Sequence, residues 1–153
     1  MKVGIIGCGN IADIYLHNAN IFFNNFEIIA CADLNSDASK YYSKKYKISN
    51  LSVEQLLSNE EIDLIINLTI PNAHYEVSKS ILNSGKHSYS EKPISIEFAQ
   101  GKELLNLAKS KNLYVGSAPD TFLGAGIQKS KQIIQDGTIG DILLGSISMG
   151  VAG

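Results

Sequence analysis

The chain has 153 residues, of which 44% are hydrophobic, and its formal net charge is −2. This length allows one hydrophobic core, so we expect a single soluble domain. Its basic residues are all lysines and are scattered, which argues against a nucleic-acid partner. Cys8 and Cys31 are too few for a disulfide scaffold and are expected to be reduced. No apolar run approaches the roughly 20 residues that cross a bilayer, so we expect a cytoplasmic protein with no membrane partner and no metal site.

Apolar stretches of strand length alternate along the chain with amphipathic stretches of helix length. Such alternation is typical of β-α-β units and of a parallel sheet that is buried on both faces. Because crossovers between parallel strands are right-handed, the pattern predicts a doubly wound α/β sheet of the Rossmann type, with helices on both faces. We expect strands at residues 2–6, 27–32, 64–68, 88–90 and 113–116, and helices at residues 37–46, 53–57, 73–83, 96–111 and 125–136.

A further helix is predicted between the first two strands. Its mostly apolar face is expected to lie on the sheet, because apolar residues recur there at helical spacing. This face consists of Ile11, Tyr15, Asn18, Ala19 and Phe22.

The C-terminal stretch has the character of one more strand, at residues 142–149, but the sequence ends at Gly153 without a partner strand. A lone strand is not stable in water. Three arrangements would give it a partner. It joins the first sheet, it pairs with another chain, as in a homo-oligomer, or this sequence is the front part of a longer protein.

A glycine-rich run follows the first predicted strand and opens the first predicted helix. Gly7, Gly9 and Ala12 form a G-x-G-x-x-A pattern, in which Gly7 permits a tight turn and Gly9 lets a pyrophosphate approach the backbone. The amides of Asn10 and Ile11, at the positive end of the helix dipole, are expected to face the phosphates. In this position the run predicts a dinucleotide site.

Asp33 follows the second predicted strand, a little over twenty residues beyond the glycines. A carboxylate there can accept hydrogen bonds from the adenosine ribose. It would repel a 2'-phosphate, and the sequence contains no arginine to bind one. The pattern therefore favours NAD over NADP. The alternative is that Asp33 caps the next turn and that the glycines only turn the chain.

Two further loops carry polar residues, after the third and fourth of the predicted strands. In a doubly wound sheet both loops open on the same carboxyl edge as the glycine turn. Thr69, Pro71, His74, Glu91 and Lys92 are therefore expected to gather around one cofactor crevice. For His74, two interpretations stay open, since its ring can either orient near the nicotinamide or cap its helix.

Together these motifs resemble the cofactor domain of the glucose-fructose oxidoreductase and inositol dehydrogenase family (Gfo/Idh/MocA). The matching segments occur in order from residue 1 to about residue 149. The Glu-Lys-Pro run after the fourth strand is the most specific of them. They are Gly7-x-Gly9-x-x-Ala12, Asp33, Thr69-x-Pro71-x-x-His74, Gly85-Lys86-His87 and Glu91-Lys92-Pro93.

This resemblance implies an NAD-dependent dehydrogenase that acts on a sugar, cyclitol or similar polyol. In the family, Lys92 hydrogen-bonds the reacting oxygen, Glu91 helps to place the nicotinamide ribose, and Pro93 often follows a cis bond. A lysine beside the nicotinamide can polarise an oxygen or relay a proton. The simpler alternative is an exposed Glu-Lys pair beside a turn proline.

The family's members are about twice as long, because a second α/β domain supplies most substrate contacts, the acid-base histidine and usually the oligomer interface. We therefore interpret residues 1–120 as an NAD-binding Rossmann domain, and residues 121–153 as a bridging helix with the first strand of a truncated second domain. On this interpretation the isolated chain is expected to be inactive. The alternatives are a free-standing NAD sensor or regulatory module, and a relative that oxidises a sugar transiently to eliminate a substituent.

Overall fold

The computed structural model describes residues 1–119, 121–146, 148 and 150, and the chain divides into two compact units, Met1–Ala118 and Pro119–Gly153. The first unit contains a six-stranded sheet in the order β3-β2-β1-β4-β5-β6, and all neighbouring strands are parallel. This order confirms the predicted doubly wound Rossmann sheet. The strands are β1 Lys2–Ile6, β2 Glu27–Ala32, β3 Ser49–Asn50, β4 Leu64–Asn67, β5 His87–Ser90 and β6 Val115–Ser117.

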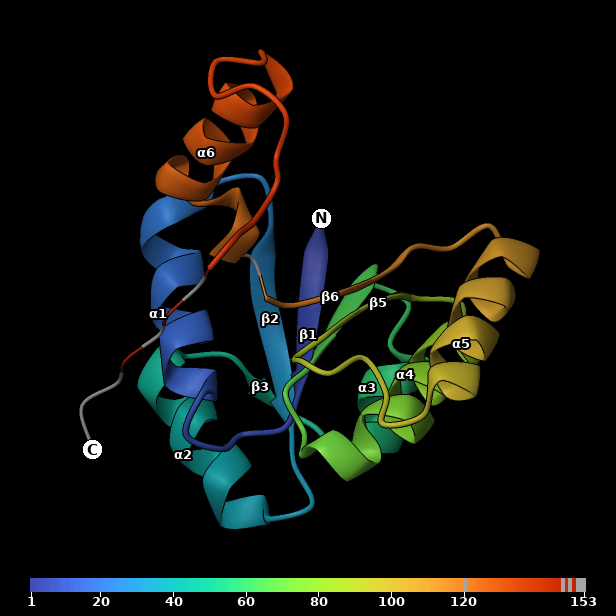
Figure 1. Cartoon of the computed structure of the whole chain (residues 1–153). Helices are drawn as coiled ribbons and strands as arrows, with labels where there is room; N and C mark the ends of the chain where they lie inside the picture. The colour runs from blue at the N-terminus through green and yellow to red at the C-terminus, as the bar shows by residue number, and fades with distance from the viewer. Residues whose placement is uncertain (120, 147, 149, 151–153) are drawn as a thin grey trace. The chain divides into compact units, whose positions relative to one another are not determined.

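Helices cover both faces of this sheet, as Figure 1 shows. One face carries α1 (Ala12–Phe22) and α2 (Ser36–Tyr46), while the other carries α3 (Val53–Ser58), α4 (His74–Asn83) and α5 (Phe98–Ser110). A short 3-10 turn, η1 (Pro71–Ala73), leads into α4. Among the described residues, no helix has both the length and the apolar character that a membrane span requires.

The hydrophobic core lies in separate layers on the two faces of the sheet. On the α1 and α2 face, Val3 and Ile5 of β1 contact a cluster that includes Leu16 of α1, and all three are at most 1% exposed. On the other face, Leu56 of α3 and Ile81 of α4 belong to a second cluster, and both are fully buried. Burial of each such side chain contributes about 1.5 to 3 kcal/mol to folding.

The predicted face of α1 is correct only in part, because Ala19 is buried and Tyr15 packs against the core while other members lie outside it. Ile11 is 42% exposed and Phe22 is 71% exposed, whereas Ala12, Leu16 and Ala19 are buried. The buried residues follow the spacing i, i+4 and i+7, which is also a helical face. Small alanine side chains let α1 approach the sheet closely, and this packing decides which face turns inward.

Several element boundaries also differ from the expectation. β4 ends one residue early, β5 begins one residue early and β6 lies at Val115–Ser117 rather than at residues 113–116. The strand β3 was not predicted at all. It has two residues, both exposed and polar, so it lacks the apolar run by which a strand is recognised.

The second unit contains the 3-10 turn η2 (Thr121–Leu123) and the helix α6 (Ala125–Gln135). The strand expected at residues 142–149 is wrong for the residues that can be judged. Residues 142–146 and 148 form no strand, and residues 147 and 149 lie outside the described part of the chain. Since a strand needs a hydrogen-bonded partner, its apolar sequence alone does not produce one.

Candidate functional site

The loops that carry the predicted site residues leave the sheet at one level of its carboxyl edge. Ile6 of β1 is in register with both Ala32 of β2 and Asn67 of β4, and Asn67 is in register with Ser90 of β5. Backbone hydrogen bonds continue this ladder by one residue, since Gly7 donates to the Ala32 carbonyl at 2.9 Å. The residues after these four strands therefore lie side by side.

The two glycines of the first loop are suited to their positions for different structural reasons. Gly7 has a φ of +103°, and a β-carbon on it would lie 2.5 Å from the carbonyl carbon of Leu68. Only glycine fits this turn without displacing the backbone after β4. At Gly9, by contrast, a β-carbon would meet no atom within 4 Å. Gly9 therefore leaves open surface at the start of α1, where a ligand group can approach.

The first residues of α1 are available to an anion. Gly9, Asn10 and Ile11 are exposed, and Ile11 is the N-cap without a side-chain hydrogen bond to the helix. The first amides of a helix have no partner inside the helix and carry the positive end of its dipole. Ala12 is completely buried, so the helix packs closely on the sheet directly behind these amides.

Asp33 fixes the glycine turn through both carboxylate oxygens. Its Oδ2 accepts a hydrogen bond from the Cys8 amide at 2.6 Å, and its Oδ1 accepts one from the Asn35 amide at 2.7 Å. Asp33 is only partly buried. The bond to the Asn35 amide is the capping contact that the sequence left open. The bond to the Cys8 amide adds a second contact, to the glycine turn. Each oxygen of a carboxylate has a further lone pair that a ribose hydroxyl can use.

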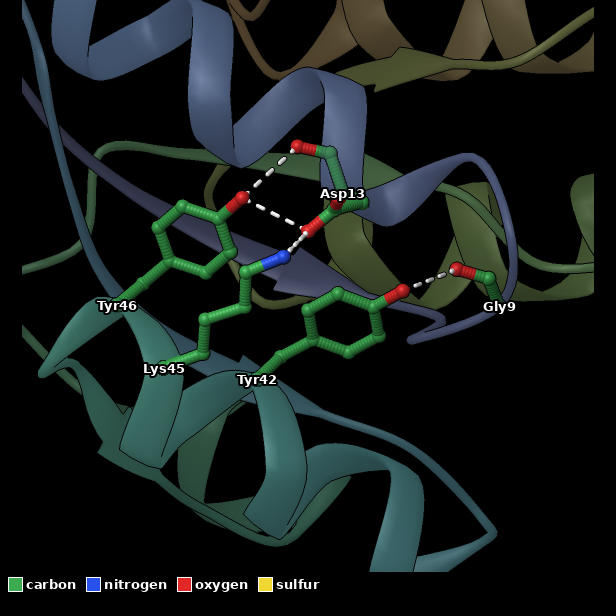
Figure 2. Close-up of polar contacts among 5 residues, drawn as sticks. All are labelled: Gly9, Asp13, Tyr42, Lys45 and Tyr46. Atoms are coloured by element: carbon green, nitrogen blue, oxygen red, sulfur yellow. Dashed lines mark hydrogen bonds and ion pairs between the residues drawn. The ribbon is translucent and has the colours of Figure 1, made fainter.

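The helix α2 also contacts the glycine turn and the start of α1 (Figure 2). The Tyr42 hydroxyl donates to the Gly9 carbonyl at 3.3 Å. The Tyr46 hydroxyl donates to Asp13 Oδ1 at 2.7 Å, and Lys45 Nζ contacts the same oxygen at 2.6 Å. These contacts join α2 to the first turn of α1.

The ion pair in Figure 2 balances the charge of Asp13 close to the glycine turn. The hydrogen bond from Lys45, with that from Tyr46, lowers the pKa of the Asp13 carboxyl below its ordinary value. The same bond to Asp13 raises the pKa of Lys45. Both groups therefore stay charged over a wide pH range. Lys45 offsets the negative charge that Asp13 would otherwise place beside an incoming phosphate.

Both cysteines are free, as expected, and both are buried. Cys8 lies in the glycine turn and its thiol donates to the Ala32 carbonyl at 3.7 Å, while the Cys31 thiol of β2 donates to the Ser39 carbonyl at 3.5 Å. The neighbouring Cys31 thiol, with burial, raises the pKa of Cys8 above its ordinary value. Cys8 consequently behaves as a small buried side chain that fits the turn, and not as a reactive thiolate.

A buried amide organises the loop after β4. Asn67 is completely buried, and its Nδ2 donates to the His74 carbonyl at 3.0 Å and to Ser78 Oγ at 3.1 Å. Its Oδ1 accepts from the Thr69 hydroxyl at 2.6 Å and from the Thr69 amide at 3.2 Å. Asn67 thereby fixes the path of the chain from β4 into α4. Thr69 is half-buried, whereas Pro71, which starts η1, is exposed at the edge.

Of the two interpretations of His74, the structure contradicts the capping of its helix. His74 is 1% exposed, and it does not cap α4, because the N-cap is Ala73 and makes no side-chain capping bond. Instead its Nδ1 lies 2.6 Å from the carbonyl oxygen of Pro93 and its Nε2 lies 2.9 Å from that of Thr69. His74 therefore lies between the loops that follow β4 and β5.

The Glu91-Lys92-Pro93 segment follows β5 directly. Glu91 donates its amide to the Asn67 carbonyl at 2.9 Å, which continues the sheet ladder. Glu91 Oε1 accepts a hydrogen bond from the Tyr15 hydroxyl at 2.7 Å, and Oε2 accepts one from the Lys92 amide at 3.0 Å. The Lys92–Pro93 bond is cis, as the resemblance implied. The Lys92 side chain is exposed at the same edge of the sheet as the glycine turn.

The structure thus brings the predicted loops together and adds residues that the sequence did not single out. Tyr15 packs against the core, as its assignment to a packing face predicted, and its hydroxyl in addition reaches Glu91. Tyr42 carried no signal, because its partner Gly9 is 33 residues away. Asn67 was the detectable case, since a polar amide interrupts an apolar strand two residues before Thr69.

Comparison with known proteins supplies a family. The model of the Gfo/Idh/MocA oxidoreductase family, NAD-binding Rossmann fold, matches residues 1–118. An uncharacterized oxidoreductase of Schizosaccharomyces pombe is 30% identical over 149 residues, which cover 94% of this chain and 40% of the relative. The structure of myo-inositol 2-dehydrogenase from Lactobacillus plantarum is similar with a TM-score of 0.83 and 21% identity, over 93% of this chain and 43% of that one. Biliverdin reductase from Synechocystis, solved with biliverdin and NADP+, has a TM-score of 0.76 and 24% identity, over 88% of this chain and 42% of that one.

The extent of these matches defines what they show. The chain spans 40% of the length of the Schizosaccharomyces pombe relative, and similar shares of the two solved structures. The family model covers the whole sheet unit with the glycine turn, Asp33 and the Glu91-Lys92-Pro93 segment. The chain therefore belongs to the Gfo/Idh/MocA oxidoreductase family and forms its NAD(P)-binding Rossmann domain.

Proposed function

We propose that this chain is the cofactor-binding part of an NAD-dependent oxidoreductase that transfers hydride between nicotinamide and a hydroxyl of a sugar, cyclitol or similar polyol. One observation carries the proposal. The phosphate turn and the Glu91-Lys92-Pro93 segment lie at one edge of the sheet, and the Tyr15 hydroxyl joins them by a hydrogen bond of 2.7 Å to Glu91. The myo-inositol dehydrogenase among the similar structures supports a polyol substrate.

The residues at this edge fit a dinucleotide. The open surface at Gly9 leaves room for a pyrophosphate, and the exposed amides of Asn10 and Ile11 are suited to bind it. Asp33 accepts hydrogen bonds from the adenosine ribose with its remaining lone pairs. Thr69 and Pro71 lie on the neighbouring loop, next to the position expected for the nicotinamide half.

Lys92 is the residue proposed to act on the substrate. As the neutral amine it would accept the proton of the hydroxyl when the substrate is oxidised, and as the ammonium it would donate a hydrogen bond to the carbonyl oxygen and return that proton in the reverse direction. Glu91, fixed by Tyr15 and by the Lys92 amide, accepts hydrogen bonds from the nicotinamide ribose. The bound nicotinamide supplies the hydride acceptor or donor. Positioning the oxygen and the nicotinamide together is the main contribution of the protein.

The preference for NAD is proposed from charge. A 2'-phosphate beside Asp33 would meet a carboxylate, and the chain has no arginine that could bind it at two points. The fold alone does not decide the matter, since the similar Synechocystis biliverdin reductase was solved with NADP+. The preference therefore depends on Asp33 and on the missing arginine.

Isothermal titration calorimetry of the chain with NAD+ and with NADP+ tests this proposal. We expect measurable binding of NAD+ and an affinity for NADP+ that is at least about 10-fold lower, which corresponds to about 1.4 kcal/mol. Equal affinities would remove the role given to Asp33. If neither nucleotide bound, the proposed site itself would be wrong.

A further inference from the structure

The buried ring of His74 joins two loops of the proposed site. It is 1% exposed, and its two nitrogens face the main-chain carbonyl oxygens of Thr69 and Pro93 at 2.9 and 2.6 Å. Thr69 follows β4, while Pro93 follows β5 and is bonded to Lys92 through the cis peptide. The ring therefore contacts the residue next to Lys92, whose amine is proposed to act on the substrate.

The chemistry of these contacts restricts the hydrogens of the ring. A carbonyl oxygen only accepts hydrogen bonds, so a ring nitrogen that bonds one must carry a hydrogen. A neutral imidazole carries a single N–H, which can serve one of the two carbonyls, whereas a ring with hydrogens on both nitrogens can serve both. The contact with Pro93 is the shorter of the two.

A second network holds the residue that carries this ring. The buried Asn67 amide donates to the His74 carbonyl at 3.0 Å, and its oxygen accepts from the Thr69 hydroxyl at 2.6 Å. Asn67 thus fixes the start of α4 and the Thr69 loop to β4 by bonds that do not involve the His74 ring. The ring is then the element that connects this fixed part to Pro93.

We propose that His74 is a positioning residue for Lys92: its buried ring, which lies between the Thr69 and Pro93 carbonyls, holds the Pro93 segment, and with it Lys92, at a fixed distance from the Thr69 loop. The inference rests on the proposed cofactor site, because it assigns His74 to the nicotinamide half of that site. It contacts neither cofactor nor substrate itself. Its effect should accordingly be confined to ligands that reach Lys92.

Nucleotide binding by variants tests the role. His74→Gln keeps a donor for one carbonyl and His74→Phe keeps none, while His87→Gln alters a histidine that accepts a bond from the Tyr114 amide near the opposite end of β5. ADP occupies only the glycine turn and Asp33, whereas NADH also reaches Lys92. We expect the NADH affinity to fall about 10-fold in His74→Phe and less in His74→Gln, with ADP affinity unchanged and His87→Gln like wild type.

The outcomes separate this inference from the proposed function. If both ligands lose affinity equally in the His74 variants, the residue only supports folding and the positioning role is wrong. If the unchanged chain binds neither ADP nor NADH, the proposed function fails instead. Nitrogen-15 NMR of the unchanged chain provides a test that needs no variant. We expect a ring N–H of His74 that exchanges slowly with water, because the ring is 1% exposed and a carbonyl accepts its hydrogen; rapid exchange of that hydrogen would overturn the contact.

Discussion

The Tyr15 hydroxyl donates a hydrogen bond of 2.7 Å to Glu91 Oε1, across a sequence separation of 76 residues. Tyr15 lies in the helix that begins at the glycine turn, and Glu91 begins the segment that carries Lys92. The second oxygen of Glu91 accepts the Lys92 amide at 3.0 Å. The carboxylate is thus fixed from both sides, so the two halves of the proposed cofactor site share one rigid contact.

Removal of the Tyr15 hydroxyl should weaken this contact while keeping the ring in place. For Tyr15→Phe we expect the free energy of unfolding to fall by about 1 kcal/mol and NADH to bind several-fold more weakly, since a hydrogen bond to a charged group is lost. Urea unfolding and calorimetric titration measure the two effects. Tyr75→Phe is a matched control, because Tyr75 also donates to a carboxylate, Glu103 Oε2 at 2.7 Å, on the exposed surface of α4 and α5.

The result for Tyr15→Phe is informative in both directions. If Tyr75→Phe weakened NADH binding as much as Tyr15→Phe, the contact with Glu91 would have no special relation to the cofactor. If Tyr15→Phe left NADH binding unchanged, the carboxylate would be held well enough by the rest of the loop.

The two glycines of the turn should respond differently to alanine. Gly7→Ala places a β-carbon 2.5 Å from the Leu68 carbonyl carbon at a positive φ, so we expect it to lower the free energy of unfolding by at least about 2 kcal/mol. Gly9→Ala meets no atom within 4 Å and should unfold at the wild-type temperature. Its new methyl group occupies the surface proposed for the pyrophosphate, and binding of ADP and NADH should fall at least about 10-fold. Thermal unfolding and titration distinguish the two, and a Gly9→Ala chain that binds ADP normally would move the phosphate site elsewhere.

Asp33 should affect the whole nucleotide, because it fixes the turn as well as facing the ribose. In Asp33→Asn one of the two oxygens becomes an NH2 group, so the side chain can accept from only one of the Cys8 and Asn35 amides. We expect ADP and NADH to bind about 10-fold more weakly and the preference for NAD+ over NADP+ to shrink. Asp37→Asn, on the exposed first turn of α2, is the control and should bind as wild type does. An unchanged preference in Asp33→Asn would show that another group excludes the 2'-phosphate.

Local sequence patterns predicted the parts of the site that depend on local backbone. The order of strands follows from alternating periodicity, and the turn at Gly7 and Gly9 needs residue types that few other structures require. Asp33 and Lys92 were expected at this edge because Asp33 directly follows β2 and the Glu91-Lys92 pair follows β5, while the role of Lys92 came from the family resemblance. Parallel strands bring such positions to one edge whatever the details of packing.

The remaining features depend on contacts between residues that are distant in the sequence. The sequence around Tyr15 and around His74 does not indicate their partners, because the Glu91 carboxylate and the Pro93 carbonyl belong to another loop. The predicted face of α1 was correct only in part for a related reason. Periodicity gives two plausible apolar stripes, and the close approach of Ala12 to the sheet, which selects between them, is a property of the folded chain.

Lys86 provides a prediction about pH. Its side chain is buried, with Nζ donating to the carbonyl oxygens of Asn59 at 2.6 Å and Ile62 at 2.9 Å, and burial lowers the pKa of Lys86 below its ordinary 10.5. The unfolded chain therefore holds this proton more tightly than the folded chain does. Its contribution to the free energy of unfolding should rise as the pH increases from the folded pKa towards about 10.5. Urea unfolding of the wild type and of Lys86→Met, from about pH 7 to about pH 10.5, isolates this contribution as their difference. That difference should shift in favour of the wild type with increasing pH, and a flat or opposite trend would show that the two carbonyls stabilise the ammonium more than burial destabilises it.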